Sequence, residues 1–210
     1  MTPVNALDAL DADELFMLGL QASTANDAGQ AIGYFKLALS RSPDHARAHW
    51  ALAAEYAGLK MMDRAEVHFA RAVELDDQHP VARFQYGLLL LTSGRLGEAE
   101  ATWAPLDALD EAHPVRLFKS GLLHMARDEF DAALVNLRQA MSDPALEPAL
   151  ARDVKMAIDQ IEAARAANPP AVDAAVAPAG DPAPAPAPAA ESVESHLAFS
   201  AYRGATDASH

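Results

Sequence analysis

The chain has no cysteine among its 210 residues. Disulfide bonds, thiolate metal sites and a cysteine nucleophile are therefore excluded. Positive charge is scarce as well, because 16 Lys and Arg residues stand against 30 Asp and Glu, for a formal net charge of -14. A nucleic-acid-binding surface needs a basic stripe to displace counterions, and an anionic membrane attracts the same kind of charge. We expect neither as a partner.

Aromatic residues and long apolar runs are also lacking. The chain is 51% hydrophobic but only 6% aromatic, because alanine dominates, and alanine favours closely packed helices. No run approaches the roughly 18 apolar residues that a membrane span needs. The first residues, Met1 to Asp8, have neither the basic nor the apolar region of a signal peptide. We expect a cytoplasmic protein that does not insert into membranes.

Chemistry-bearing motifs are missing too. The sequence contains no glycine-rich phosphate loop and no recognisable nucleophile and base pair. His45 and His49 have the i,i+4 spacing that can hold a metal on a helix, but no third ligand is evident. His79 and His113 precede prolines and are expected to cap helices. We therefore predict no catalytic residue, no metal site and no cofactor, so the protein is not expected to be an enzyme.

Four segments of the chain repeat every 34 residues. The units begin at Ala12, Ala46, Pro80 and Pro114 and cover residues 12–45, 46–79, 80–113 and 114–147. Small residues recur at positions 8 and 20 of the unit, and a large apolar residue recurs at position 24. Those at position 8 are Gly19, Ala53, Gly87 and Gly121, those at position 20 are Ala31, Ala65, Ala99 and Ala133, and those at position 24 are Phe35, Phe69, Trp103 and Leu137. A period of this length is typical of stacked helical hairpins, none of which buries its apolar face alone.

This pattern resembles the tetratricopeptide repeat (TPR) family over residues 12–147. The resemblance implies an all-α fold, a right-handed superhelical solenoid of four helical hairpins. Its helices are expected over residues 12–25, 28–41, 46–59, 62–75, 80–93, 96–109, 114–127 and 130–142. A weaker similarity, carried by Leu15–Gly19 and Gly94–Ala99 together with the small acidic chain, links it to class II chaperones of type III secretion systems.

Four further segments flank the repeats. Residues 1–11 are expected to be a flexible leader. Residues 148–167 predict a capping helix, with an apolar stripe at helical spacing formed by Leu150, Val154, Ala157, Ile158 and Ile161. Residues 168–193 are rich in Pro and Ala and predict a disordered linker. Apolar residues return in the tail peptide, residues 194–210, as Leu197, Phe199 and Tyr202; we expect this peptide to dock on a protein surface, either on this chain's own groove, in the same or a neighbouring copy, or on a separate partner.

The resemblance also implies a binding groove, because the first helix of each TPR hairpin lines the concave face. Positions 5, 9 and 12 then point into the groove, and position 5 carries an aromatic ring in every unit. The predicted groove residues are Phe16, Leu20, Trp50, Ala54, Phe84, Leu88, Leu91, Phe118, Leu122 and Met125. Contiguous apolar strips with aromatic anchors usually mark interaction sites. The groove lacks the Lys, Arg and Asn residues with which some family members hold a terminal carboxylate.

We therefore expect a non-catalytic scaffold or adaptor that binds a protein or peptide ligand through apolar anchors. One alternative is a secretion-type chaperone for hydrophobic client proteins. Another is a permanent subunit of a larger assembly, in which case a partner would co-purify at fixed stoichiometry.

Overall fold

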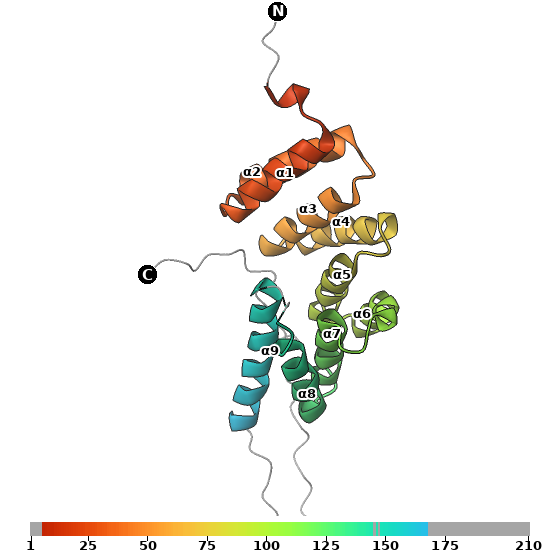
Figure 1. The fold of residues 1–210 in the computed structure, drawn as a ribbon, viewed down its shortest axis with the longest axis vertical. Coiled ribbons are helices and arrows are strands. Elements are labelled where there is room, and N and C mark those ends of the chain that lie inside the picture. The colour runs from red at the N-terminus through yellow and green to blue at the C-terminus, as the bar shows by residue number, and fades with distance from the viewer. Residues whose placement is uncertain (1–5, 145, 147, 168–210) are drawn as a thin grey trace, which may run out of the picture.

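The computed structural model describes residues 6–144, 146 and 148–167, and these residues contain helices and no strands. The hairpins follow one another along the long axis of the molecule, from α1 at one end to α9 at the other (Figure 1). The helices are α1 (Ala12–Thr24), α2 (Ala28–Arg41), α3 (Ala46–Gly58), α4 (Met62–Leu75), α5 (Pro80–Thr92), α6 (Leu96–Trp103), α7 (Pro114–Met125), α8 (Phe130–Met141) and α9 (Pro148–Ala167), with the 3-10 helices η1 (Ala6–Ala9) and η2 (Ala104–Ala108). The predicted all-α solenoid of four hairpins is confirmed.

All eight hairpin helices begin where the repeat pattern predicts, because local signals fix their first residues. Asp11 and Glu14 form a capping box at α1, each accepting a backbone N–H of the other at 2.8 and 2.9 Å. Pro80 and Pro114 occupy the first turns of α5 and α7, where a missing N–H costs nothing.

Each hairpin turns at position 15 of its unit. The residues there have the positive φ that reverses the chain, and they are Asn26 (59°), Lys60 (62°), Gly94 (74°) and Asp128 (58°). Gly and Asn reach this region readily, whereas Lys60 does so at some cost. Gly94 and Asp128 thus reverse the chain between the two helices of the third and fourth hairpins.

The second helix of the third hairpin is shorter than predicted. We expected it to span residues 96–109, but α6 ends at Trp103 and the chain continues as η2. Pro105 explains the difference, because it has no N–H to donate to a carbonyl one turn earlier and its ring crowds that turn. The 3-10 segment then supplies Asp107, whose carboxylate lies 2.5 Å from the ammonium of Lys119, a buried side chain of α7.

The leader is more ordered than expected from residue 6 onward. Ala6–Ala9 form η1, and Leu7 and Leu10 pack against the core. Arg41 of α2 donates to the carbonyl oxygen of Asp8 at 3.3 Å. Only residues 1–5 of the leader lie outside the described part of the chain.

Within each hairpin, a small residue at position 8 of the first helix faces the large residue at position 24 of the second. A methyl group added to Gly19 would come within 2.3 Å of the Phe35 ring, and one on Gly87 within 2.1 Å of the Trp103 indole. Trp103 is buried and donates its Nε1–H to the carbonyl of Phe84 at 2.9 Å. The close approach explains why a small residue is needed at position 8 opposite a large one at position 24, and Trp103 is a core residue.

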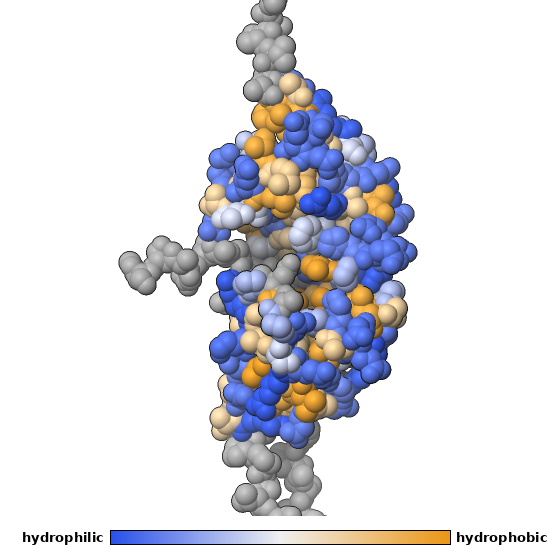
Figure 2. All heavy atoms as spheres, in the orientation of Figure 1, coloured by the Kyte–Doolittle hydropathy of each residue, from blue (hydrophilic) through white to orange (hydrophobic). Residues whose placement is uncertain are grey.

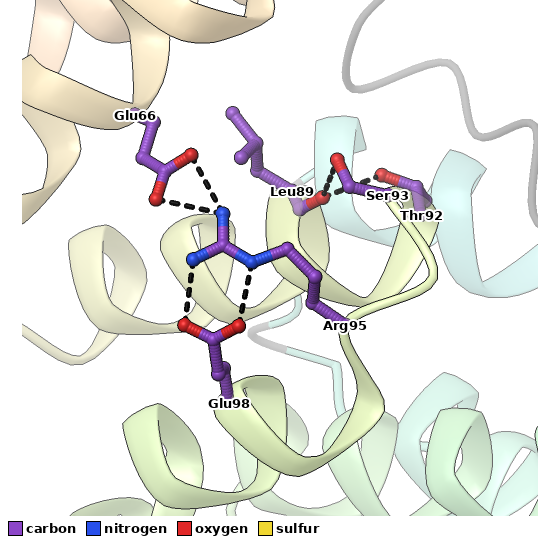
Figure 3. A network of polar contacts seen from close by, with 6 residues as sticks. All are labelled: Glu66, Leu89, Thr92, Ser93, Arg95 and Glu98. Carbon is purple, nitrogen blue, oxygen red and sulfur yellow. Dashed lines mark hydrogen bonds and ion pairs between the residues drawn. The ribbon is translucent and has the colours of Figure 1, made fainter.

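Neighbouring hairpins are also joined by ion pairs. Arg95, at the start of α6, holds Glu66 of α4 through contacts of 2.7 and 2.8 Å, and Glu98 of its own helix at 2.6 and 2.7 Å (Figure 3). Beside it, Ser93 and Thr92 donate their hydroxyls to the Leu89 carbonyl. The guanidinium lowers the pKa of the Glu98 carboxyl through its hydrogen bonds.

Helix α9 covers α8 at the open end of the stack, with Val154, Ala157 and Ile161 buried and Leu150 and Ile158 packed against the core. It is the capping helix that a solenoid needs. The predicted linker, residues 168–193, and the tail peptide with Leu197, Phe199 and Tyr202 lie outside the described residues. No described helix combines the length and the apolar composition that a membrane crossing requires.

Candidate functional site

The ten predicted groove residues all lie on first helices of hairpins, α1, α3, α5 and α7, and all belong to or pack against one hydrophobic cluster. They differ in exposure. Seven are buried, and these are Phe16, Phe84, Leu88, Leu91, Phe118, Leu122 and Met125. Leu20, Trp50 and Ala54 are partly exposed. A ligand of this structure would therefore meet the surface around these three residues first.

The buried rings at position 5 pack both within and between repeats. The Phe16 ring lies 5.9 Å from Phe35 and 5.3 Å from His45 of its own unit, measured between ring centroids. Phe84 is stacked on Trp103 of its own unit at 5.7 Å and lies 5.0 Å from Phe118 of the next. The contact of Phe84 with Phe118 therefore joins the third hairpin to the fourth, as buried aromatic pairs do.

Trp50 is the position-5 ring with accessible surface. Its centroid lies 5.5 Å from that of His79, and its Nε1–H donates to Oε1 of Gln85 on α5 at 2.7 Å. These two contacts fix the orientation of the indole while part of it faces solvent. An indole that is held in place and partly exposed matches the residue type most often found as an anchor in protein interfaces.

Polar and charged contacts cross the same surface. Ser23 of α1 donates to Glu55 of α3 at 2.5 Å. The guanidinium carbon of Arg47 lies 4.5 Å from the centre of the Phe16 ring and covers it. The accessible residues of the predicted groove are thus Leu20 on α1 and Trp50 and Ala54 on α3, and α3 also carries Arg47 and Glu55. We call the three accessible residues the Trp50 surface.

Histidine caps recur at three repeat junctions, and their full role was not predicted. His45, His79 and His113 each accept a backbone N–H at Nδ1, from Ala48, Ala82 and Val115, at 3.1, 3.1 and 3.2 Å. His45 and His79, the last residues of the first and second units, also pack on the position-5 ring of their own unit. The signal was present in the sequence, because each of these rings precedes its histidine by the same number of residues.

The pair His45 and His49 does not form a metal site in the described residues. His45 caps α3, while His49 turns toward α4, where its Nδ1 lies 2.9 Å from Nδ1 of His68. No group of three or more His, Cys, Asp or Glu side chains placed to hold a metal ion occurs in the described part of the chain.

The face of the molecule drawn in Figure 2 is hydrophilic with scattered apolar areas. On the face shown in Figure 2, hydrophobic residues form separate clusters among hydrophilic ones. Exposed large apolar residues also occur on second helices, as at Val67 of α4 and Val135 of α8, each 66% exposed. Single exposed apolar residues of this kind are normal and need no partner.

Comparison with known proteins points to one family. The tetratricopeptide repeat family model matches residues 46–79, the second of the four units. Among solved structures, that of MamA is similar, with 18% identity, a TM-score of 0.53, and coverage of 62% of this chain and 76% of MamA. YrrB, described as a TPR protein with an unusual peptide-binding site, is 22% identical over 69% of this chain and 92% of its own, with a TM-score of 0.31. No curated protein matches the sequence.

Proposed function

We propose that this tetratricopeptide repeat protein is a non-catalytic scaffold that binds an apolar peptide or helix of a partner protein on its Trp50 surface. Repeats of this family generally serve protein–protein interaction. The observation that carries the proposal is the environment of Trp50, a partly exposed indole held by Gln85 and His79. Leu20 and Ala54, which pack against the same hydrophobic cluster, are partly exposed as well. Fixing the ring before binding lowers the entropy lost when a ligand contacts it.

The buried groove residues have a supporting part in this proposal. Phe84 and Leu88 of α5 and Phe118 of α7 are part of the hydrophobic core, and the contact of Phe84 with Phe118 joins the third and fourth hairpins. Ligand contact with Leu91, Leu122 or Met125 would need the surface of α5 and α7 to open. The Trp50 surface needs no such change.

The tail peptide belongs to the same chain, and we propose that it competes with external ligands for the Trp50 surface. Leu197, Phe199 and Tyr202 supply apolar anchors. A linker of about 28 residues would span roughly 30 Å root-mean-square. Tethering at that length gives an effective concentration on the order of millimolar, so even a weak peptide would occupy the site part of the time. Deleting residues 192–210 should then tighten binding of an external ligand. Unchanged amide exchange along α1 and α3 after this deletion would contradict self-docking.

Selection of peptides on the immobilised protein tests the proposed function. A displayed library of random peptides should yield binders with two or more large apolar anchors. Trp50→Ala should weaken their binding at least about tenfold, which corresponds to ~1.4 kcal/mol. Val135→Ser is the matched control, because it removes an exposed apolar side chain from a second helix and should leave binding unchanged.

Two outcomes would overturn the proposal. The first is a selection that yields no apolar binder, and the second is binding that Trp50→Ala leaves intact. Purification of the chain from its native source separates the alternatives: a permanent assembly subunit co-purifies at fixed stoichiometry, whereas a scaffold or a client chaperone exchanges its ligand with added peptide.

A further inference from the structure

A cluster of positive and titratable side chains surrounds Tyr56, away from the Trp50 surface. The Nζ of Lys36 lies 5.8 Å from the centre of the Tyr56 ring, and the guanidinium carbon of Arg64 lies 5.6 Å from it. The His68 ring is stacked on the same tyrosine at 5.7 Å. These residues come from three successive helices, α2, α3 and α4, which lie together in Figure 1. We call Lys36, His49, Arg64 and His68 the basic cluster.

The two permanent charges of the basic cluster are not neutralised by the chain. Within the residues that the structure describes, neither Lys36 nor Arg64 pairs with a carboxylate, although the chain carries 30 of them. Two carboxylates on neighbouring segments pair with other residues, Asp44 with Arg71 and Glu66 with Arg95. Both cations are exposed. Within the described residues, this acidic protein thus has a local positive site that no carboxylate neutralises.

The two histidines add charge that depends on pH. Their Nδ1 atoms lie 2.9 Å apart, and Nε2 of His49 lies 2.9 Å from the carbonyl oxygen of Pro43, to which it donates. One proton fits between the two Nδ1 atoms, and a second would set two N–H groups against each other. The pKa of His68 is lowered by burial, then by His49 and Lys36. No carboxylate is among these causes. The groups that act on His68 are Lys36 of α2, which is positively charged, and His49 of α3, which becomes positive when it is protonated.

We propose that the basic cluster binds an oxyanion, either a carboxylate of an acidic protein segment or a phosphate group. An anion that contacts Lys36 and Arg64 would supply the missing counter-charge. It would also stabilise the protonated form of the histidine pair. By linkage, the protonated pair then binds the anion more tightly than the neutral pair does. The site is separate from the Trp50 surface and does not depend on it.

Histidine proton resonances test this inference on the full chain. The His68 pKa is measured in tetraglutamate, in inorganic phosphate, and in sodium chloride at the same ionic strength. With the anion bound, the pKa of His68 should be about half a unit higher than in sodium chloride. This rise corresponds to anion binding that is roughly threefold tighter to the protonated form than to the neutral form. A response to tetraglutamate alone identifies protein carboxylates as the source, and a response to phosphate alone identifies a phosphate-bearing group.

Variants decide whether the basic cluster is responsible. Lys36→Gln combined with Arg64→Gln should abolish the response, and both side chains are exposed, so the fold should persist. Lys155→Gln removes an exposed lysine of α9, paired with Asp159, and should leave the response intact. The inference is overturned when neither probe shifts His68 beyond chloride, or when the shift survives in the double variant.

Discussion

Aromatic residues occupy position 5 in all four hairpins, but some are buried in the core whereas Trp50 is partly exposed. Phe84 is 3% exposed between Trp103 and Phe118, and it joins the third and fourth hairpins. Trp50 is partly exposed and is held by polar contacts at its edge. The same sequence position thus serves stability in one repeat and, on our proposal, binding in another.

Alanine substitution should separate these roles. Phe84→Ala should lower the free energy of unfolding by about 3–5 kcal/mol, as truncation of a buried ring usually does. Trp50→Ala should lower it clearly less, because part of the indole is already hydrated. Urea unfolding followed by circular dichroism measures both. Equal losses would show that Trp50 is as much a core residue as Phe84.

Acid should weaken the second hairpin through His68. Burial, His49 and Lys36 lower its folded pKa below 6.5, so between that value and 6.5 the unfolded chain binds a proton that the folded chain does not. The contribution of His68 is therefore complete above about pH 6.5 and is lost as the pH falls through the folded pKa. Unfolding free energies from pH 7.5 to pH 5 measure the loss. His68→Phe keeps a ring on Tyr56 and should flatten this pH dependence; an unaltered slope would contradict the assignment.

At the scale of helices, the glycines show what the hairpins require. Gly87→Ala should destabilise the protein by roughly 1–3 kcal/mol, because its new methyl group would overlap the Trp103 indole. Gly33 lies inside α2 with no atom within 4 Å of an added methyl group. Gly33→Ala should therefore stabilise by about 0.5–1 kcal/mol through helix propensity. Thermal unfolding of both variants checks the prediction, which fails if the two shift the midpoint in the same direction.

Helix α6 ends early, and the η2 segment that follows it supplies Asp107, which pairs with Lys119 of α7. Asp107→Ala would leave the buried ammonium of Lys119 without its carboxylate, and a cost of about 1–3 kcal/mol is expected. The exposed pair of Arg138 and Glu162 is the comparison, and Glu162→Gln should cost about 0–1 kcal/mol. Denaturant unfolding of the two variants measures the difference. If Asp107→Ala lowered the free energy of unfolding no more than Glu162→Gln does, Lys119 would have to bind another side chain or water.

Helix starts were predictable from the sequence because they depend on local signals. Asp11, Pro80 and Pro114 act within one turn of their own helix, and the 34-residue period repeats those signals. The repeat pattern predicted a longer α6, because a period shared by four units does not reflect the break that Pro105 causes in one of them. The contact of His49 with His68 joins two helices and depends on how they pack, so spacing alone did not indicate it.

At the scale of the whole molecule, the predicted groove residues lie on the first helices of the hairpins, but the sequence did not indicate how exposed each of them is. Position within a repeat indicates the face on which a side chain lies. Exposure also depends on how closely the next hairpin approaches, and Trp103 and Phe118 cover Phe84 because α5, α6 and α7 pack tightly around it. The prediction that all ten groove residues contact a ligand stays a prediction, and the structure directs its first test to Leu20, Trp50 and Ala54.

Amide hydrogen exchange of the chain with a selected apolar peptide tests the central proposal most directly. Our account predicts slower exchange in α1 and α3, residues 12–24 and 46–58, when the peptide is bound. Trp50→Ala should remove this protection, and Val135→Ser should retain it. Protection confined to α2, α4 or α8, or protection in α1 and α3 that persists in Trp50→Ala, would contradict the proposal that the Trp50 surface is the binding site.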